Sequence, residues 1–539
     1  MSKTKDLMRK GSFLVMISVF IKFIGFIYRI PMTNMLGDTG NSYYGVAFQI
    51  YSFFIILSTF GVSESISRMI SERLAKREYA NARQVFWMGL MYAGGSGIVY
   101  CSILLFGGDL IADKFYNMPQ AASAVRSLAP AVLMVSVSSV FRGLYQGIGD
   151  VRTSAYADLL DQVFHALFSV LLVWVTISSQ NALMDVQKNQ VLEEAAAQGA
   201  RGSMYGAMGG LLFLLAVFLL FKARSTIFNA PASKITERKS TLFKYFLCLV
   251  IPIMIAASVS NLREIVDTAL FKALMPLKGY ETDYINTQLG QLTGKYNVMI
   301  NMPIAALGTL TIVLVPGIAR AITRKDHRTI QEHIDTLMKL VLMVSMPAAV
   351  GLSILGDPII QWLFPSANEG GELLQFGSFM IIFFAISQNA AAILQGLGKI
   401  KQPVLNAVKG ACISIPVLIA SILLLNLQVY SMVISVTLFG FCIAFFNMRS
   451  VLKYSQCKIN MLRLLVSPAV CSLIMGCCTW LIYHGLYALI PSHTVSILGS
   501  IVVSVAVYFL MLLNSSWYTR EQILELPYGR LFIRLRFRK

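Results

Sequence analysis

Two basic side chains lie within the first apolar stretch of the sequence, where a charge is costly and calls for a partner or a function. Lys22 and Arg29 are seven residues apart, so two helical turns would place them on one face, with Gly25 between them allowing close approach. Facing a water-filled cavity, the two cations would bind a pyrophosphate, Arg29 through its planar fork. The alternative is that Arg29 snorkels to the outer interface while Lys22 pairs elsewhere.

A second charged set lies in the apolar stretch at residues 243–274. Arg263 and Asp267 are four residues apart, which would let them pair along one helix. Asp267 could instead face Lys409, which lies in a later apolar stretch. We expect a structural ion pair here, with ion coupling or gating as the alternative.

Two further pairs could serve in coupling or gating. Asp161 and His165 are one helical turn apart, and a carboxylate beside a histidine could relay protons. The favourable position of acidic residues near a helix N-terminus is a simpler explanation for Asp161 and its neighbour Asp158. Glu64 and Arg68 are also four residues apart and could form a cytoplasmic gate pair or a solvated one.

The sequence offers little for covalent chemistry. Its eight cysteines are scattered, mostly in apolar runs, without a CxxC pair or metal-ligand spacing. The two QGxG stretches follow no predicted strand, so they are not dinucleotide fingerprints, and no other nucleotide-binding motif is present. We therefore expect no enzymatic activity, no metal and no cofactor, and leave open whether Na⁺, H⁺ or the membrane potential drives the protein.

The composition determines which elements must position these residues. Hydrophobic residues make up 56% of the 539-residue chain, charged residues only 13%, and the mean hydropathy is +0.67. Too little polar surface exists to coat a water-soluble protein of this size. The apolar runs do not alternate, which predicts an all-α integral membrane protein. The net charge of +19 is spread over short connections, which argues against nucleic acid as a partner.

Fourteen apolar segments are predicted to cross the membrane, although thirteen or fifteen would also fit. The first is too long for a signal peptide and lacks a cleavage site, so we expect it to be retained. The segments lie at residues 11–31, 43–61, 84–107, 125–146, 154–178, 203–222, 243–274, 291–318, 335–362, 373–396, 402–425, 428–449, 464–487 and 494–514.

The connections between these segments alternate in charge. Those that follow even-numbered segments hold most of the cations, for example Arg73 and Lys76, whereas the others are acidic or balanced, for example Asp109 and Glu193. The positive-inside rule places the cationic set and both termini in the cytoplasm.

The sequence contains a repeat. YQGIGDVR at residues 145–152 resembles LQGLGKIK at 394–401, and two shorter matches share the same offset of roughly 250 residues. Two parallel six-helix units are a transporter architecture, with substrate handled between the halves. We therefore predict an N-lobe at residues 1–222, a cytoplasmic linker at 223–242, a C-lobe at 243–451, and two extra helices with a basic tail at 452–539.

Four stretches together resemble the MOP exporter superfamily, and most of all its MurJ/SpoVB-type lipid II and polysaccharide-precursor flippases. They are SVFIKFIGFIYRIPMTNMLG (residues 18–37), FGVSESISRMISE (60–72), FRGLYQGIGD (141–150), and the pattern YNVMINMP…LVPGIARA (296–321). The resemblance covers the first twelve segments and the fourteen-helix layout.

The resemblance implies two lobes in a V around a cationic cavity that opens alternately to the cytoplasm and to the outside. It also implies that the last two helices form a groove for a polyprenyl tail. The expected function is translocation of a polyprenyl-pyrophosphate-linked cell-wall precursor, lipid II or a related oligosaccharide, from the inner to the outer leaflet. The expected setting is a bacterial cytoplasmic membrane, whose lipids the protein contacts, and the expected state is a monomer.

The sequence departs from the family at two cavity arginines. Ile55 and Ile56 stand where one of them is usual, and Val298 stands in place of the other. Lys295, nearly one turn earlier, is a candidate substitute. Asn297 and Asn301 would lie on an adjoining polar stripe of the substrate cavity. The alternative for Lys295 is a position at the outer membrane surface.

Two other functions compete with a flippase. A multidrug and toxin extrusion antiporter of the same superfamily would need acidic and aromatic residues in its cavity, and the cations Lys22 and Arg29 count against it. A membrane glycosyltransferase would need paired carboxylates on a sizeable external loop. The longest such loop, at residues 179–202, has no convincing pair.

Overall fold

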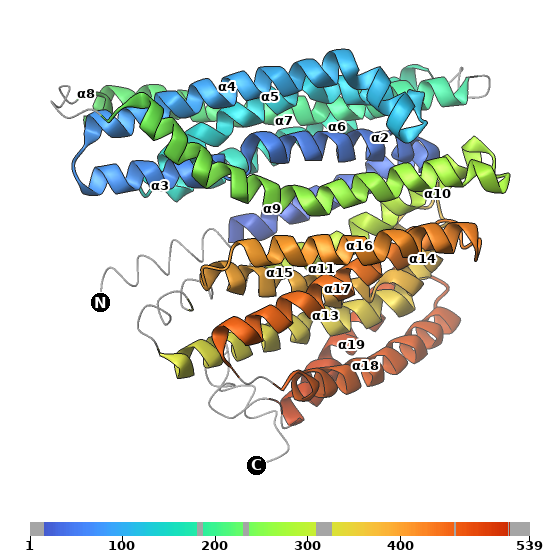
Figure 1. Cartoon of the computed structure of the whole chain (residues 1–539). Coiled ribbons are helices and arrows are strands. Elements are labelled where there is room, and N and C mark those ends of the chain that lie inside the picture. Colours follow the sequence, from blue (N-terminus) through green and yellow to red (C-terminus); the bar gives the residue numbers. More distant parts are fainter. Residues whose placement is uncertain are drawn as a thin grey trace. The chain divides into compact units, whose positions relative to one another are not determined.

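The computed structural model describes residues 16–180, 187–229, 237–308, 318, 326–457, 460–515 and 517. All the regular secondary structure in these ranges is helical (Figure 1). The second part of the predicted segment 291–318, part of the predicted linker and most of the basic C-terminal tail lie outside them. The contacts divide the chain into two compact units. The N-terminal unit comprises Met1–Gly294 and Ile415–Met432, and the C-terminal unit comprises Lys295–Ser414 and Val433–Lys539.

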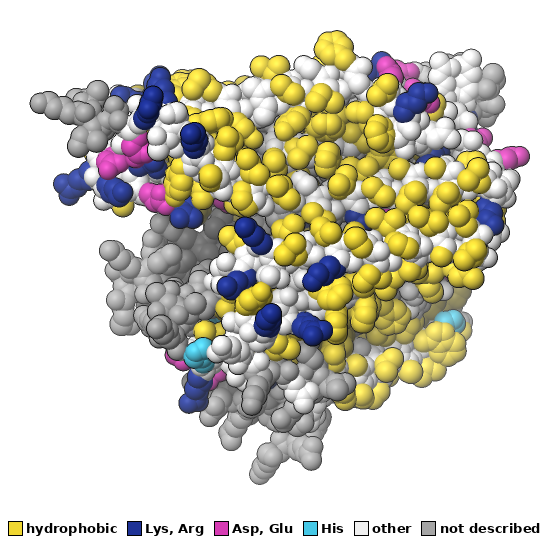
Figure 2. Space-filling view, viewed as in Figure 1, with side chains coloured by type: hydrophobic (Ala, Val, Ile, Leu, Met, Phe, Trp, Pro, Cys, Tyr) yellow, Lys and Arg dark blue, Asp and Glu magenta, His cyan; other side chains and the backbone are white. Residues whose placement is uncertain are grey.

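The described helices are long and apolar enough for a membrane, which confirms the predicted fold class. Eleven of them could each cross a bilayer, or twelve if a pair bent by 54° at residues 371–396 forms one span, and Met16–Ile27 is a shorter apolar helix. Large side chains such as Phe106, Leu424 and Leu489 are at least 80% exposed, and hydrophobic side chains cover much of the face in Figure 2. The number of fourteen spans stays a prediction.

The N-terminal unit is built on α2, which packs against α5, α7 and α9, while α6 and α7 pack along each other. Its interior contains an aromatic core centred on Phe86, whose ring contacts Phe141 and Phe218. The helices are α2 (Arg29–Thr59), α3 (Val62–Ala75), α4 (Tyr79–Leu110), α5 (Ala122–Gly147), α6 (Val151–Ser179), α7 (Lys188–Arg224), α8 (Thr226–Asn229), α9 (Lys239–Leu274) and α10 (Thr282–Gly290).

The connection between the first two predicted segments differs from our expectation. Residues 32–42, predicted as a loop, are helical except at Gly37, where φ is +62° and ψ is −173°. Glycine tolerates this backbone conformation because it has no Cβ. A single residue therefore separates the first helix from the second. Gly61, with φ +79°, makes a similar break between α2 and α3.

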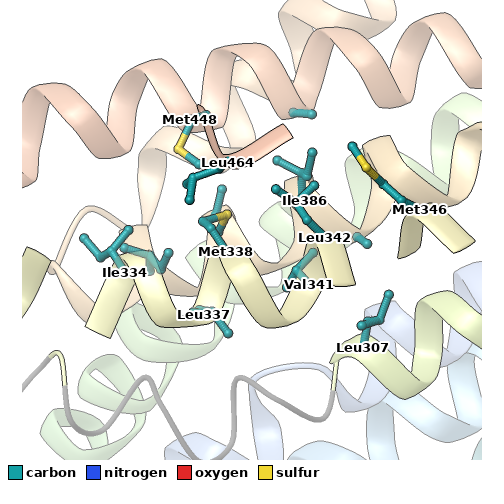
Figure 3. Packing of buried hydrophobic residues seen from close by; sticks show 14 of the residues in the cluster. Leu307, Ile334, Leu337, Met338, Val341, Leu342, Met346, Ile386, Met448 and Leu464 are labelled. Atoms are coloured by element: carbon teal, nitrogen blue, oxygen red, sulfur yellow. The ribbon is translucent and has the colours of Figure 1, made fainter. Parts of the chain in front are cut away.

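The C-terminal unit is centred on α13, which packs against α14, α15 and α18. Ile334, Leu337, Met338, Val341 and Leu342 follow the spacing of one helical face, and they are fully or almost fully buried (Figure 3). The helices are α11 (Asn297–Gly308), α13 (His327–Leu363), α14 (Gly371–Gly377), α15 (Met380–Gly396), α16 (Lys401–Leu423), α17 (Tyr430–Ser455), α18 (Met461–Leu489) and α19 (His493–Asn514), of which α16 and α17 also extend into the N-terminal unit.

The two QGxG stretches close their helices in the same way. At the end of α5, the Gly149 amide donates to the Gln146 carbonyl and the Asp150 amide to the Tyr145 carbonyl. At the end of α15, Gly398 and Lys399 donate to Gln395 and Leu394 in the same pattern. Gly149 and Gly398 have φ of +86° and +72°, the left-handed conformation of a glycine helix cap. The sequence match thus reflects a shared turn.

The contacts group α9 and α10 with the helices that precede them, whereas the repeat predicts a lobe boundary after residue 222. The two divisions rest on different properties: the units come from the contacts between helices, and the lobes come from the sequence repeat. The predicted lobes, linker and C-terminal appendage stay predictions.

Candidate functional site

Arg29 lies on a layer of aromatic rings in the N-terminal unit. Its guanidinium carbon is 4.6 Å from the centre of the Tyr44 ring, 5.7 Å from that of Phe48 and 5.9 Å from that of Tyr28. Tyr44 is fully buried, and its ring stacks on Phe48 at 5.5 Å. The face of an aromatic ring attracts a guanidinium, but the ring cannot neutralise the charge of the guanidinium. Among the residues that the structure describes, Arg29 forms no ion pair, so no carboxylate there neutralises its charge.

Lys22 belongs to the same continuous helical stretch as Arg29. The Tyr28 amide donates to the Ile24 carbonyl and the Met32 amide to the Tyr28 carbonyl, which joins Met16–Ile27 to the start of α2. The predicted two-turn spacing is therefore present in the structure. Lys22 is exposed, whereas a Cβ added to Gly25 would lie 3.5 Å from the Gln162 amide of α6. This is an ordinary van der Waals distance, so the structure does not require a glycine at position 25 for the helix to approach α6.

Asp161 lies in an ion-pair cluster with Arg142, a residue of α5. The Arg142 Nη2 is 2.8 Å from Asp158 Oδ1 and 3.7 Å from Asp161 Oδ2. The prediction that the helix N-terminus explains Asp158 and Asp161 is incomplete, because α6 begins at Val151 and a guanidinium binds both carboxylates. Two carboxylates around one arginine leave a surplus negative charge.

His165 connects this cluster to the aromatic layer around Arg29. Its ring lies 5.1 Å from that of Tyr28 and 6.2 Å from that of Phe48. The Nε2 atom is at hydrogen-bond distance, 3.1 Å, from Ser203 Oγ on α7. Arg29 and His165 therefore share two aromatic neighbours, and His165 and Asp161 lie one turn apart on α6. The structure brings these three predicted residues into one region.

Glycines of α7 explain how α6 holds Asp161 and His165 there. Gly202, Gly206 and Gly210 recur every four residues, the spacing of close helix pairs in membranes. A Cβ on Gly206 would approach Asp161 Oδ1 and His165 Cβ to 2.8 Å. A larger residue at this position would displace the two side chains.

Arg263 and Asp267 form the predicted ion pair along α9. Their side chains are 5% and 1% exposed, and Nη2 lies 3.0 Å from Oδ2. The ion pair is therefore present, and a structural role for it stays a prediction. Lys409, the alternative partner of Asp267, is exposed on α16, with its ammonium 5.9 Å from the centre of the Phe446 ring. Gating by these residues stays a prediction.

The predicted pair of Glu64 and Arg68 is wrong. Arg68 Nε donates to Glu72 Oε1 at 2.9 Å, and these two side chains are 61% and 41% exposed. Both carboxylates are four residues from Arg68, but Glu72 also accepts a hydrogen bond from the Tyr245 hydroxyl at 3.3 Å. That second contact favours Glu72 as the partner.

Lys295 is fully buried in the C-terminal unit. Its ammonium donates to the carbonyls of Ala367 and Glu369 at 2.8 and 2.6 Å, so it holds the connection between α13 and α14. That connection belongs to the set predicted to be external, so a position at the outer membrane surface, which was the alternative, stays open as a prediction. Asn297 is half-buried and Asn301 is exposed. A role of these three in substrate binding stays a prediction.

Two features were missed in the sequence. One is Arg142, although its place within the predicted span 125–146 was a signal for an intramembrane partner. The ring of Tyr44 could not be assigned to Arg29 because the break at Gly37 decides which side chains meet. Among the described residues, no group of three or more His, Cys, Asp or Glu side chains is placed to hold a metal.

The sequence matches, over residues 7–316, a family model described as polysaccharide biosynthesis protein. It is similar to stage V sporulation protein B of Bacillus subtilis (strain 168), with 22% identity over 98% of this chain and 100% of that protein. It is also similar to the lipid II flippase MurJ of the same organism, with 23% identity over 75% of this chain and 76% of that protein.

Solved structures show the same fold. An inward-facing MATE-family multidrug resistance transporter of the MOP superfamily gives a TM-score of 0.67 at 13% identity, covering 83% of this chain and 100% of that one. The lipid II flippase MurJ in an inward closed conformation gives 0.62 at 14% identity, covering 93% and 97%. Identities this low show a common fold and do not separate a flippase from a drug exporter.

Proposed function

Because the chain belongs to the polysaccharide biosynthesis protein family, we propose that it is an alternating-access flippase of the MOP exporter superfamily. Its cargo is a polyprenyl-pyrophosphate-linked cell-wall precursor, lipid II or a related lipid-linked oligosaccharide. The cargo moves from the inner to the outer leaflet, and the protein contacts membrane lipids throughout. No covalent chemistry is part of this function.

The observation that carries the proposal is the environment of Arg29. The guanidinium rests on Tyr44 at 4.6 Å and forms no ion pair among the described residues, while Lys22 lies two turns away in the same helical stretch. A pyrophosphate presents oxygens that match the planar fork of an arginine. An organic cation would be repelled by both side chains, which argues against the drug-extruder alternative.

The Arg142 cluster is our candidate for energy coupling. Asp158 and Asp161 share one guanidinium, and Asp161, at the longer distance, is the carboxylate more readily available to a proton or Na⁺. His165, one turn away, can accept or donate a proton through Ser203. The membrane potential alone is the alternative, since it acts on any charge that moves within the membrane.

The charge alternation of the connections supports an orientation with both termini in the cytoplasm. The similarity to proteins of Bacillus subtilis supports a bacterial cytoplasmic membrane as the location. We propose that the protein acts as a monomer. Asn297, Asn301 and Lys295 stay candidate ligands in the C-terminal unit.

Complementation tests the proposal in cells. The wild-type protein and Lys22→Ala and Arg29→Ala variants are expressed in a bacterium depleted of its own lipid II flippase, and membrane levels are matched by immunoblot. Lys114→Ala and Arg126→Ala serve as controls, since both residues lie on the surface beside carboxylates. Rescue by the wild type and the controls, with failure of Lys22→Ala and Arg29→Ala, is the expected result.

The other outcomes of this experiment distinguish between the possible cargoes. No growth with well-expressed wild-type protein would contradict lipid II as the cargo and favour another lipid-linked glycan. Protection of the cells against cationic dyes, without rescue, would favour the drug extruder.

A further inference from the structure

The sequence contains no Asp or Glu between Glu372 and Glu521. The same stretch contains basic residues near the ends of its helices that are predicted to face the cytoplasm. Three of them, Lys399, Arg449 and Lys453, are exposed in the C-terminal unit and form no ion pair with any residue that the structure describes. Figure 2 shows Lys and Arg side chains gathered near the left-hand ends of α15, α16 and α17.

Two of these cations converge on one aromatic ring. The ammonium groups of Lys399 and Lys453 lie 5.0 and 5.7 Å from the centre of the Tyr454 ring. The Tyr454 hydroxyl accepts a hydrogen bond from Gln402 Nε2 at 3.0 Å, which fixes the ring between α16 and α17. The positive-inside rule requires cations on this side of the membrane but does not require two of them to share a ring. Since like charges repel, an anion bound beside them would stabilise this arrangement.

An apolar stripe leads from these cations along α17. Phe441, Phe445, Arg449 and Lys453 recur every four residues and are all exposed, so they lie along one side of the helix. The ring of Phe445 stacks on that of Phe441 at 6.4 Å, and Phe441 also contacts Phe383 of α15 at 5.4 Å. The surface is therefore aromatic toward the middle of the helix and basic at its end.

We propose that this surface binds an anionic phospholipid of the inner leaflet. The phosphate would lie at Lys399, Arg449 and Lys453, and the acyl chains would lie along Phe441 and Phe445. Basic residues at the cytoplasmic ends of membrane helices attract anionic headgroups in this way. The proposal depends on the predicted orientation but not on the transported cargo, because none of these residues is assigned to transport.

The test uses the purified full-length protein in detergent, with the number of bound lipids counted by native mass spectrometry. Phosphatidylglycerol is titrated against the wild type, Lys399→Gln/Lys453→Gln, and the control Lys114→Gln/Lys188→Gln, whose lysines are exposed on the predicted external side. Each cation near the membrane surface contributes to such binding, and Lys399→Gln/Lys453→Gln lacks two of the three. The first double variant should therefore bind phosphatidylglycerol at least about tenfold more weakly, and the control should bind it like the wild type.

Further measurements test the charge selectivity of the surface and the role of the Tyr454 ring. Phosphatidylcholine should bind the wild type and the first double variant equally, and Tyr454→Leu should weaken phosphatidylglycerol binding while all the charges remain. Unchanged phosphatidylglycerol binding by Lys399→Gln/Lys453→Gln would overturn the proposal. Displacement of phosphatidylglycerol by equimolar farnesyl pyrophosphate, lost in the same variant, would overturn it too, since the surface would then receive the cargo. These results do not depend on whether the protein flips lipid II.

Discussion

The guanidinium of Arg29 lies 4.6 Å from the centre of the buried Tyr44 ring, across the backbone break at Gly37. Arg29 precedes the break and Tyr44 follows it, so a single non-helical residue brings the two side chains together. The ring supports the arginine without neutralising it. A carboxylate at the same place would hold the arginine as firmly but would compete with an anionic substrate.

Two substitutions of Tyr44 should distinguish the contribution of its ring to transport from that of its hydroxyl. Tyr44→Phe keeps the stacking surface and should transport at a rate close to that of the wild type. Tyr44→Leu removes about 0.5–2 kcal/mol of cation–π attraction, so transport should fall several-fold. The rate of lipid translocation at matched protein levels checks this, and equal rates for the two variants would show that the ring has no role.

A double-mutant cycle should measure the interaction energy between Arg142 and Asp158. Arg142→Ala leaves Asp158 and Asp161 without their cation and should lower the free energy of unfolding in mixed micelles. Because Asp158 is half-exposed, the coupling energy between Arg142 and Asp158 should be about 1 kcal/mol. Additive effects of Arg142→Ala and Asp158→Ala would show that the 2.8 Å contact contributes nothing.

Asp161→Asn should affect coupling more than folding. The amide keeps the shape of the carboxylate but cannot take up a proton or bind Na⁺ as an anion. Transport driven by an imposed pH or Na⁺ gradient should be lost, while the melting temperature stays near that of the wild type. Retention of gradient-driven transport would favour the membrane potential as the driving force.

The close packing of α6 on α7 makes Gly206 sensitive to substitution. Gly206→Ala should cost about 1–3 kcal/mol, because a Cβ there meets Asp161 and His165 at 2.7–2.8 Å. Gly94→Ala in α4 is the matched control, since a Cβ at that position meets nothing within 4 Å. Thermal unfolding of the two variants should differ clearly. Similar melting temperatures would contradict this packing.

Lys295 offers a test that separates structure from binding. Lys295→Met removes two hydrogen bonds from a buried ammonium to partly buried carbonyls and should destabilise the protein by about 1–3 kcal/mol. A structural role predicts loss of stability together with loss of activity. Normal stability with lost transport would instead identify Lys295 as a substrate ligand.

The sequence predicted the helical class and the family. It also singled out Arg29, Asp161 and His165, because charges inside apolar segments are costly and conspicuous. Lys22 and Arg29 share one helical stretch, and Arg263 pairs with Asp267, as their spacing indicated. Interactions at a spacing of three or four residues within one helix can be read from sequence alone.

Contacts between helices could not be predicted in this way. The sequence could not show that Arg142 of α5 binds Asp158 and Asp161 of α6, or that Tyr44 lies beneath Arg29. It also offered two equivalent partners for Arg68 at four residues' distance, and the choice of Glu72 depends on Tyr245 of another helix. Such choices follow from packing, which the spacing of residues along one helix does not encode.

Translocation by the purified protein tests the central claim most directly. Proteoliposomes with fluorescent lipid II in both leaflets are treated with a membrane-impermeant quencher, and the protected fraction is followed over time. We predict that the wild type makes the inner-leaflet lipid II accessible and that Arg29→Ala, folded to the same extent, does so at least about tenfold more slowly, the loss expected for one charge-assisted contact. Lipid II that stays protected with wild-type protein, or equal rates for the two proteins, would contradict the account.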